Sequence, residues 1–317
     1  MYLSKVFFDT YVKDGVIDLP NVVHGGTGFY YDKAPMLPIE VEHSFPYYDL
    51  YKSWVDKMIA SGRKRDEFIW YLDFSIGYTT RGCINGCEFC VNKNYKESIR
   101  WSRLDEFYDP SRKYICLLDD NVLACKDWRA IFEELEATGR KLVYRQGLDE
   151  RLLTEEKCKW IFERFKWYGD YIFAFDRIKD KEIIIKKLEL IRSMTGKDHI
   201  KFYLFCGFNH AVPYTYSDEF WAQDVNDLFE RIHILIQYKC YPYVMRYKDY
   251  ELSPYRGMYI AIASWCNQLS MFKKKSLREF AYAKLEDGNR AILRYIREFE
   301  GIHPEIARKY YDLKWEP

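Results

Sequence analysis

Residues 115–144 have the sequence ICLLDDNVLACKDWRAIFEELEATGRKLVY, and this stretch predicts the fold class. The apolar run at 115–118 predicts a strand, and a second run at 142–144 predicts another. Between them, Asp127 is a typical helix N-cap and Gly139 a typical helix end. Strands that are apolar on both faces and alternate with helices indicate a parallel sheet covered on both sides. The stretch therefore predicts an α/β protein.

The same alternation of strands and helices extends over residues 67–250. Further strands are predicted at 70–77, 171–175, 202–205 and 241–247, and further helices begin at the N-caps Thr154, Asp180 and Ser217. Such a series suits a doubly wound sheet or a partial barrel, and periodicity does not choose between them. In both folds ligands bind at the carboxyl ends of the strands, so the residues that follow each strand are candidate site residues.

Two segments flank this core. Residues 1–66 are rich in Gly, Pro and Tyr and predict an ordered but irregular N-terminal extension. Residues 251–317 predict a helical C-terminal extension, with surface helices from residue 276 onward. We therefore expect three parts, with the boundaries 1–66, 67–250 and 251–317.

Composition excludes several classes of protein. The chain is 48% hydrophobic and has 49 basic against 48 acidic side chains, which argues against disorder and against a strongly electropositive DNA-coating protein. It has no apolar run of the roughly 18 residues that a membrane span needs, and Asp9 interrupts the N-terminus too early for a signal peptide. We expect a cytoplasmic protein with no membrane partner. Disulfides are rare in that compartment, so the nine cysteines favour metal binding.

The motif that carries chemistry is residues 78–90, YTTRGCINGCEFC. It places Cys83, Cys87 and Cys90 at the spacing CxxxCxxC directly after a predicted strand. Three thiolates on one loop can bind a single metal centre and leave one coordination position open. Gly82 and Gly86 let the backbone fold tightly around that centre. A closed zinc site is the alternative, but it needs a fourth ligand, and the other six cysteines form no CxxC pair.

This motif, with Phe89 directly before the last cysteine, resembles that of the radical S-adenosylmethionine superfamily. Residues 79–83 (TTRGC) resemble the branch that includes cobalamin-binding radical enzymes and methylthiotransferases. The chain lacks the Asp-x-His-x-x-Gly motif that ligates cobalamin. It also lacks the upstream cysteines that hold the second cluster of methylthiotransferases, because Cys83 is its first cysteine. We therefore expect one cluster per chain and no cobalamin.

The resemblance implies a partial (β/α)6 barrel of the TIM type, with a 4Fe–4S cluster held by Cys83, Cys87 and Cys90. S-adenosylmethionine would bind the fourth iron, and an electron from a donor such as flavodoxin or ferredoxin would cleave it. The resulting 5′-deoxyadenosyl radical would abstract hydrogen from a substrate. The implied cofactor contacts lie near the motif or at strand ends: Phe89, Leu118, Asp119, Asp120, Gln146, Asp176, Arg177, Cys206 and Arg246.

Alternatives remain at several of these positions. The aspartates at 119 and 120 could simply form a turn, Asp176 and Arg177 could form a structural ion pair, and the basic run 273–275 could be a solvated helix face rather than part of a substrate site. We expect Cys158, together with the cysteines in or beside strands, to be small buried hydrophobes. The substrate is expected to be a nucleic-acid base or nucleotide, and a peptide is the second choice. The alternative function is a non-catalytic iron–sulfur or zinc-binding interaction protein.

Overall fold

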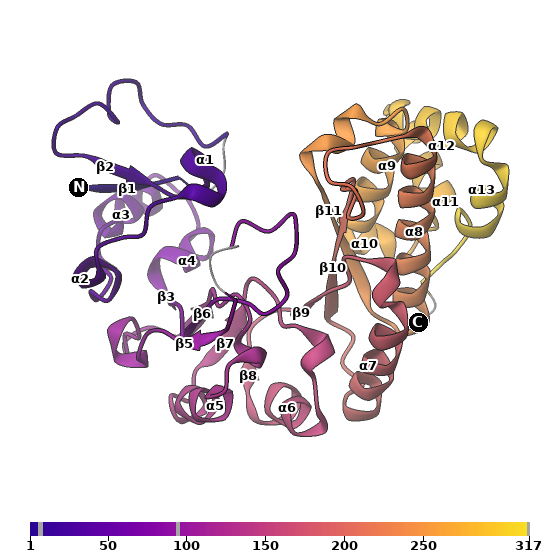
Figure 1. Cartoon of the computed structure of the whole chain (residues 1–317). Helices are drawn as coiled ribbons and strands as arrows, with labels where there is room; N and C mark the ends of the chain where they lie inside the picture. Colours follow the sequence, from indigo (N-terminus) through magenta and orange to yellow (C-terminus); the bar gives the residue numbers. More distant parts are fainter. Residues whose placement is uncertain (6–8, 93–95, 316–317) are drawn as a thin grey trace. The chain divides into compact units, whose positions relative to one another are not determined.

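The computed structural model describes residues 1–5, 9–92 and 96–315. The chain divides into two compact units, residues 1–138 and residues 139–317, which are coloured from indigo to magenta and from magenta to yellow (Figure 1). Both units combine helices with strands that pair in parallel, so the predicted α/β class is confirmed. No helix in the described ranges has both the length and the apolar character needed to span a bilayer.

The first unit begins with short elements, as expected for an irregular extension. Strand β1 (Tyr2–Ser4) pairs in parallel with β2 (Val23–Gly25). Four helices follow, of which only α3 exceeds four residues: α1 (Thr27–Tyr30), α2 (Ile39–Glu42), α3 (Lys52–Ala60) and α4 (Ile69–Leu72).

The core of the first unit is a parallel strand pair. Strand β3 (Phe74–Gly77) pairs with β6 (Tyr114–Leu117), and the buried residues of both strands are apolar apart from Ser75. Strand β4 (Thr80–Arg81) pairs antiparallel with β5 (Ile99–Arg100), and helix α5 (Trp128–Ala137) follows Asp127 as predicted.

The strand predicted at 70–77 is wrong in its first half, because residues 69–72 form helix α4. Two hydrogen bonds from the Arg65 guanidinium to the Asp73 carboxylate, at 2.8 and 2.9 Å, fix the end of this helix. The Asp73 amide also donates to the carbonyl of Ile69 at 2.8 Å, which closes the last turn. The apolar pattern alone did not reveal the Arg65–Asp73 ion pair or the hydrogen bond from the Asp73 amide.

The strands of the second unit follow the predicted order. Strand β7 (Lys141–Tyr144) pairs in parallel with a two-residue strand, β8 (Lys166–Trp167), which the sequence did not predict. Strands β9 (Tyr171–Ala174), β10 (Ile200–Cys206) and β11 (Tyr241–Arg246) form a parallel sheet with β10 in the middle. The carboxyl ends of β9 and β10 therefore lie side by side.

Three helices alternate with these strands: α6 (Glu155–Lys159), α7 (Lys181–Met194) and α8 (Asp218–Gln237). The predicted caps Thr154 and Ser217 are confirmed, since each side chain accepts a hydrogen bond from a backbone amide in the first turn of its helix. Asp180 occupies the N-cap position of α7, but its side chain makes no capping hydrogen bond.

The C-terminal segment forms five helices: α9 (Arg256–Cys266), α10 (Leu269–Phe272), α11 (Leu277–Glu286), α12 (Ala291–Ile302) and α13 (Pro304–Tyr310). Helix α8 contacts β10 and β11, α9 contacts β11, and α13 contacts α8 (Figure 1). The prediction that residues from 276 onward form surface helices is wrong in one respect. Four of their side chains are fully buried: Phe280, Ile296, Tyr310 and Tyr311. These helices contribute a second apolar layer outside α8 and α9.

Candidate functional site

The cysteine loop, residues 78–92, begins directly after β3. Gly82 and Gly86 have φ values of 92° and 55°, in the left-handed region that glycine adopts without strain. Between them the chain turns so that Cys83 and Cys87 lie on the same loop, and the Cys90 amide donates to the Cys87 carbonyl at 3.0 Å. The two glycines thus supply the turns that the CxxxCxxC spacing requires.

Asp119, two residues after β6, fixes the start of this loop. Its Oδ1 accepts hydrogen bonds from the Thr80 amide at 2.6 Å and from the hydroxyls of Thr79 and Thr80 at 2.5 and 2.7 Å. Its Oδ2 accepts from the Thr79 amide at 3.2 Å. Asp119 is only 1% exposed, and this burial raises the pKa of its carboxyl, while the hydrogen bonds oppose the shift. Asp119 is thus an anchor for the loop, and its cofactor contact stays a prediction.

The two residues after Asp119 contact the cysteine segment itself. Asp120 accepts from the Gly82 amide at 2.9 Å and from the Asn92 side-chain amide at 2.5 Å. The Asn121 side-chain amide donates to Cys83 Sγ at 3.5 Å. The Asn92 backbone amide donates to Cys90 Sγ at 3.4 Å. Two of the three motif cysteines, Cys83 and Cys90, thus have a hydrogen-bond donor at their sulfur. Such hydrogen bonds stabilise the negative charge of a thiolate.

The N-terminal extension also contacts the loop. Glu42, at the end of α2, accepts from the Arg81 guanidinium at 2.6 Å and from the Trp101 indole at 3.2 Å. Arg81 also lies over the Tyr78 ring, 3.5 Å from its centroid. These contacts immobilise the residues that directly precede the first cysteine.

The nine cysteines fall into two groups. Cys83, Cys87 and Cys90 are half-buried, whereas the other six are buried: Cys116, Cys125, Cys158, Cys206, Cys240 and Cys266. The expectation of small buried hydrophobes is therefore confirmed. Within the described ranges, no group of three or more His, Cys, Asp or Glu side chains has an arrangement that would hold a metal ion. The donor set of the loop, three accessible thiols with amides directed at two of them, has the chemistry that an iron–sulfur cluster requires.

The remaining first-unit candidates lie beside this loop. Phe89 is half-buried, and its carbonyl accepts a hydrogen bond from the Tyr31 hydroxyl at 3.3 Å. Leu118, between β6 and Asp119, is also half-buried. Both are close in sequence to the anchored segments, and their contacts to a cofactor stay predictions.

The other five candidates belong to the second unit. Gln146 and Arg246 are exposed at the ends of β7 and β11, and Arg246 lies over the Tyr250 ring at 4.5 Å. Cys206 is 2% exposed at the end of β10. Arg177 forms an ion pair at 2.9 Å with Asp180, not with Asp176 as the structural alternative proposed.

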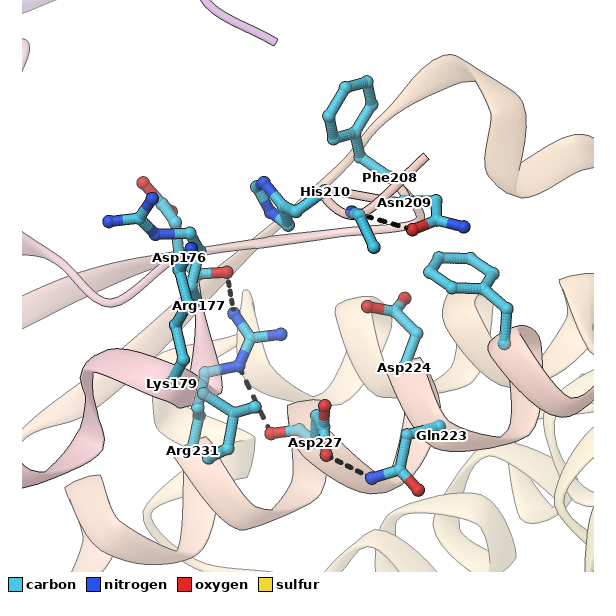
Figure 2. Close-up of a pocket in the computed structure, with 13 residues that line it drawn as sticks. Asp176, Arg177, Lys179, Phe208, Asn209, His210, Gln223, Asp224, Asp227 and Arg231 are labelled. Atoms are coloured by element: carbon cyan, nitrogen blue, oxygen red, sulfur yellow. Dashed lines mark hydrogen bonds between the residues drawn. The ribbon is translucent and has the colours of Figure 1, made fainter. Parts of the chain in front are cut away.

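Asp176 and Arg177 line a pocket of about 200 Å³ at the carboxyl ends of β9 and β10 (Figure 2). Burial raises the pKa of Asp176 to about 6, although the positive charge of Arg231 lowers it. Burial likewise raises the pKa of Asp224, on the α8 wall of the pocket. These are the perturbed carboxyl groups that candidate ligand sites commonly contain.

Sequence reasoning missed the pocket residues on α8, three of which are charged. Asp224, Asp227 and Arg231 recur at intervals of three and four, which places them on one face of the helix. Arg231 is 2% exposed, and its Nη1 donates to the carbonyls of Phe175, Asp176 and Phe205, each at 2.9 Å. Each of the three directly precedes a buried apolar residue of the helix (Val225, Leu228 and Ile232), and this pairing is the signal that could have identified them.

Glu150 lies after β7 in a charged run, residues 149–151, that the sequence places at the ligand face, but its burial was not predicted. It is 2% exposed, and its Oε2 accepts a hydrogen bond from the Ala174 amide at 3.1 Å. Burial raises the pKa of Glu150 most, and the neighbouring negative charge of Asp149 raises it further, to about 8. Its carboxyl is therefore largely protonated at neutral pH.

A search against protein-family models found no match to this chain, and a search of curated proteins found none either.

Proposed function

We propose that this protein is a radical S-adenosylmethionine enzyme whose Cys83, Cys87 and Cys90 hold one 4Fe–4S cluster. The observation that carries the proposal is the anchoring of the cysteine loop by Asp119, Asp120 and Asn121, three consecutive residues after β6. These contacts hold the segment that leads into the three cysteines, and a loop that binds a cluster needs such support for its ligands.

The residues of the loop fit the cluster in their chemistry. The three thiols are the accessible cysteines of the chain, and amides donate to the sulfurs of Cys83 and Cys90. When bound, the cluster would supply the electron for reductive cleavage of S-adenosylmethionine. In such enzymes the radical formed by this cleavage abstracts hydrogen from a substrate. The protein's own contribution is to orient the thiolates, stabilise their charge and exclude water.

The proposal includes the partial (β/α)6 barrel, one cluster per chain, no cobalamin, and an external electron donor such as flavodoxin or ferredoxin. The parallel pairing of β3 with β6 supports the barrel, as does the parallel pairing of β10 with both β9 and β11. The other predicted cofactor contacts remain part of the proposal.

The proposed substrate is a nucleic-acid base or nucleotide. Of the basic run, Lys273 is paired with Asp198 at 3.3 Å, whereas Lys274 is exposed. Only part of this run is thus available to a phosphate backbone. A peptide is the second candidate substrate.

Anaerobic reconstitution with iron and sulfide, followed by metal analysis, tests the cluster. We expect about four irons per chain and a brown protein. The Cys87→Ala variant should lose most of this iron, because one of only three protein ligands is missing. The matched control Cys158→Ala should keep it, since Cys158 is buried in α6. Stoichiometric zinc in place of iron in the purified chain would contradict the proposal.

A further inference from the structure

Asn121 is a buried polar residue that reaches one of the motif cysteines with its side chain. It is 3% exposed, and its side-chain amide donates to Cys83 Sγ at 3.5 Å. Buried amide groups are hydrogen-bonded in nearly all folded proteins, and here one of the partners is a cysteine sulfur. The contact joins the strand pair β3–β6 to the first cysteine of the loop.

The backbone of Asn121 is itself held in place. Its carbonyl oxygen accepts from the Ser98 hydroxyl at 2.8 Å and from the Ala124 amide at 3.2 Å. Ser98 is buried, and so are the two residues that follow Asn121. The amide therefore approaches Cys83 from a fixed segment that is largely closed to water. In such surroundings a hydrogen bond is electrostatically stronger than it is in water.

The donor at Cys83 differs in kind from the donor at Cys90. Cys90 Sγ accepts from the Asn92 backbone amide at 3.4 Å, and only a change to proline removes a backbone donor. The donor at Cys83 belongs to a side chain, so a substitution removes it and leaves the backbone in place. Asp119 and Asp120, which precede Asn121, accept hydrogen bonds from the loop instead of donating them. Asn121 thus places the positive end of a dipole at the sulfur.

A hydrogen bond to a ligand sulfur affects the reduction potential of an iron–sulfur cluster. One-electron reduction adds negative charge to the cluster and its sulfur ligands. A donor at sulfur stabilises the reduced form more than the oxidised form, so it raises the potential. A negative charge in the same place repels the added electron and lowers the potential.

We propose that Asn121 is a positioning residue that raises the reduction potential of the cluster through its amide at Cys83. The inference rests on the proposed function, because it needs a cluster held by Cys83, Cys87 and Cys90. It separates two roles within the segment after β6. Asp119 fixes where the loop lies, and Asn121 sets how readily the bound cluster accepts an electron.

The test is an anaerobic redox titration of the reconstituted chain, with dithionite as the reductant and electron paramagnetic resonance of the reduced cluster as the readout. Asn121→Leu removes the donor at similar shape, and Asn121→Asp replaces it with a negative charge. At a fixed potential, the ratio of reduced to oxidised cluster should be about fivefold lower in Asn121→Leu than in the wild type, which corresponds to one ordinary hydrogen bond. The ratio should be lower again in Asn121→Asp. A side chain that only supported the loop would not produce this order.

Asn289→Asp is the matched control. It makes the same chemical change at an exposed position of the second unit and keeps an oxygen for the Ala291 amide, so its midpoint potential should equal that of the wild type. Equal midpoint potentials in the wild type and Asn121→Leu would overturn the inference. Loss of the cluster from both Asn121 variants would overturn it as well, because Asn121 would then be needed to hold iron. In either case a wild type with about four irons leaves the proposed function standing. A wild type that takes up no iron would overturn the proposed function, and this inference with it.

Discussion

Asp119 connects β6 to the cysteine loop, and its role follows from its partners. Two backbone amides and two hydroxyls donate to it at distances between 2.5 and 3.2 Å, in a site almost closed to water. Such a carboxylate cannot be removed without leaving buried donors unsatisfied. It therefore couples the position of the loop to the strand pair β3–β6.

Replacing Asp119 should destabilise the protein strongly. Asp119→Ala leaves the amides of Thr79 and Thr80 without their acceptor, so urea unfolding should give a loss of about 2–4 kcal/mol in the free energy of unfolding. Asp105→Ala, at a site that is exposed in the same unit, should cost less than about 0.5 kcal/mol. A similar small loss for both variants would show that the loop does not depend on this anchor.

Glu150 predicts a pH dependence of stability. Its pKa is about 8 in the folded state and ordinarily near 4.5, so the folded protein retains a proton that the unfolded chain releases. This contribution to stability is fully present below pH 4.5 and is lost as the pH rises through 8. Glu150→Gln keeps an oxygen for the Ala174 amide but cannot ionise. Between pH 6 and 9 the urea midpoint of the wild type should fall more than that of the variant, and parallel curves would contradict this assignment.

Among the elements, α8 links the sheet to the pocket. Ser217 caps its first turn, Asp224 and Asp227 line the pocket, and Arg231 crosses to the carbonyls that end β9 and β10. The terminal carbonyls of neighbouring parallel strands point the same way, and the buried guanidinium satisfies them. One face of the helix thus supports the sheet and shapes the pocket.

An uncharged residue in place of Arg231 should leave the carbonyls at the strand ends without a hydrogen-bond donor. It should also leave the carboxylates of Asp176 and Asp224 without a neighbouring positive charge. Arg231→Met, of similar length, should lower the free energy of unfolding by about 3–5 kcal/mol at pH 7.5. The loss should be smaller at pH 5, because Asp176, whose pKa is about 6, is then protonated and needs no cation. Urea unfolding at both pH values measures this, and an equal loss at both would show that Arg231 acts only through the carbonyls.

Across the whole chain, local patterns predicted the α/β class and most strands, because apolar runs and helix caps are properties of neighbouring residues. They failed where side-chain contacts outside the apolar pattern decide the outcome. The Arg65–Asp73 ion pair lies at the end of the helix of residues 69–72, and packing against α8 and α9 buries Tyr310 and Tyr311. The cysteine loop was predicted from its spacing. Asp119 depends on partners 39 and 40 residues away, and Arg231 on carbonyls 26 to 56 residues away, which no local pattern encodes.

The most direct test of the proposed function is formation of 5′-deoxyadenosine. The reconstituted chain of 317 residues is incubated anaerobically with dithionite and S-adenosylmethionine, and the products are measured by mass spectrometry. We predict that the wild type and Cys158→Ala form 5′-deoxyadenosine and methionine in equal amounts, and that Cys87→Ala forms neither above the protein-free background. No 5′-deoxyadenosine from a wild-type chain that holds about four irons, or full formation by Cys87→Ala, would contradict the account.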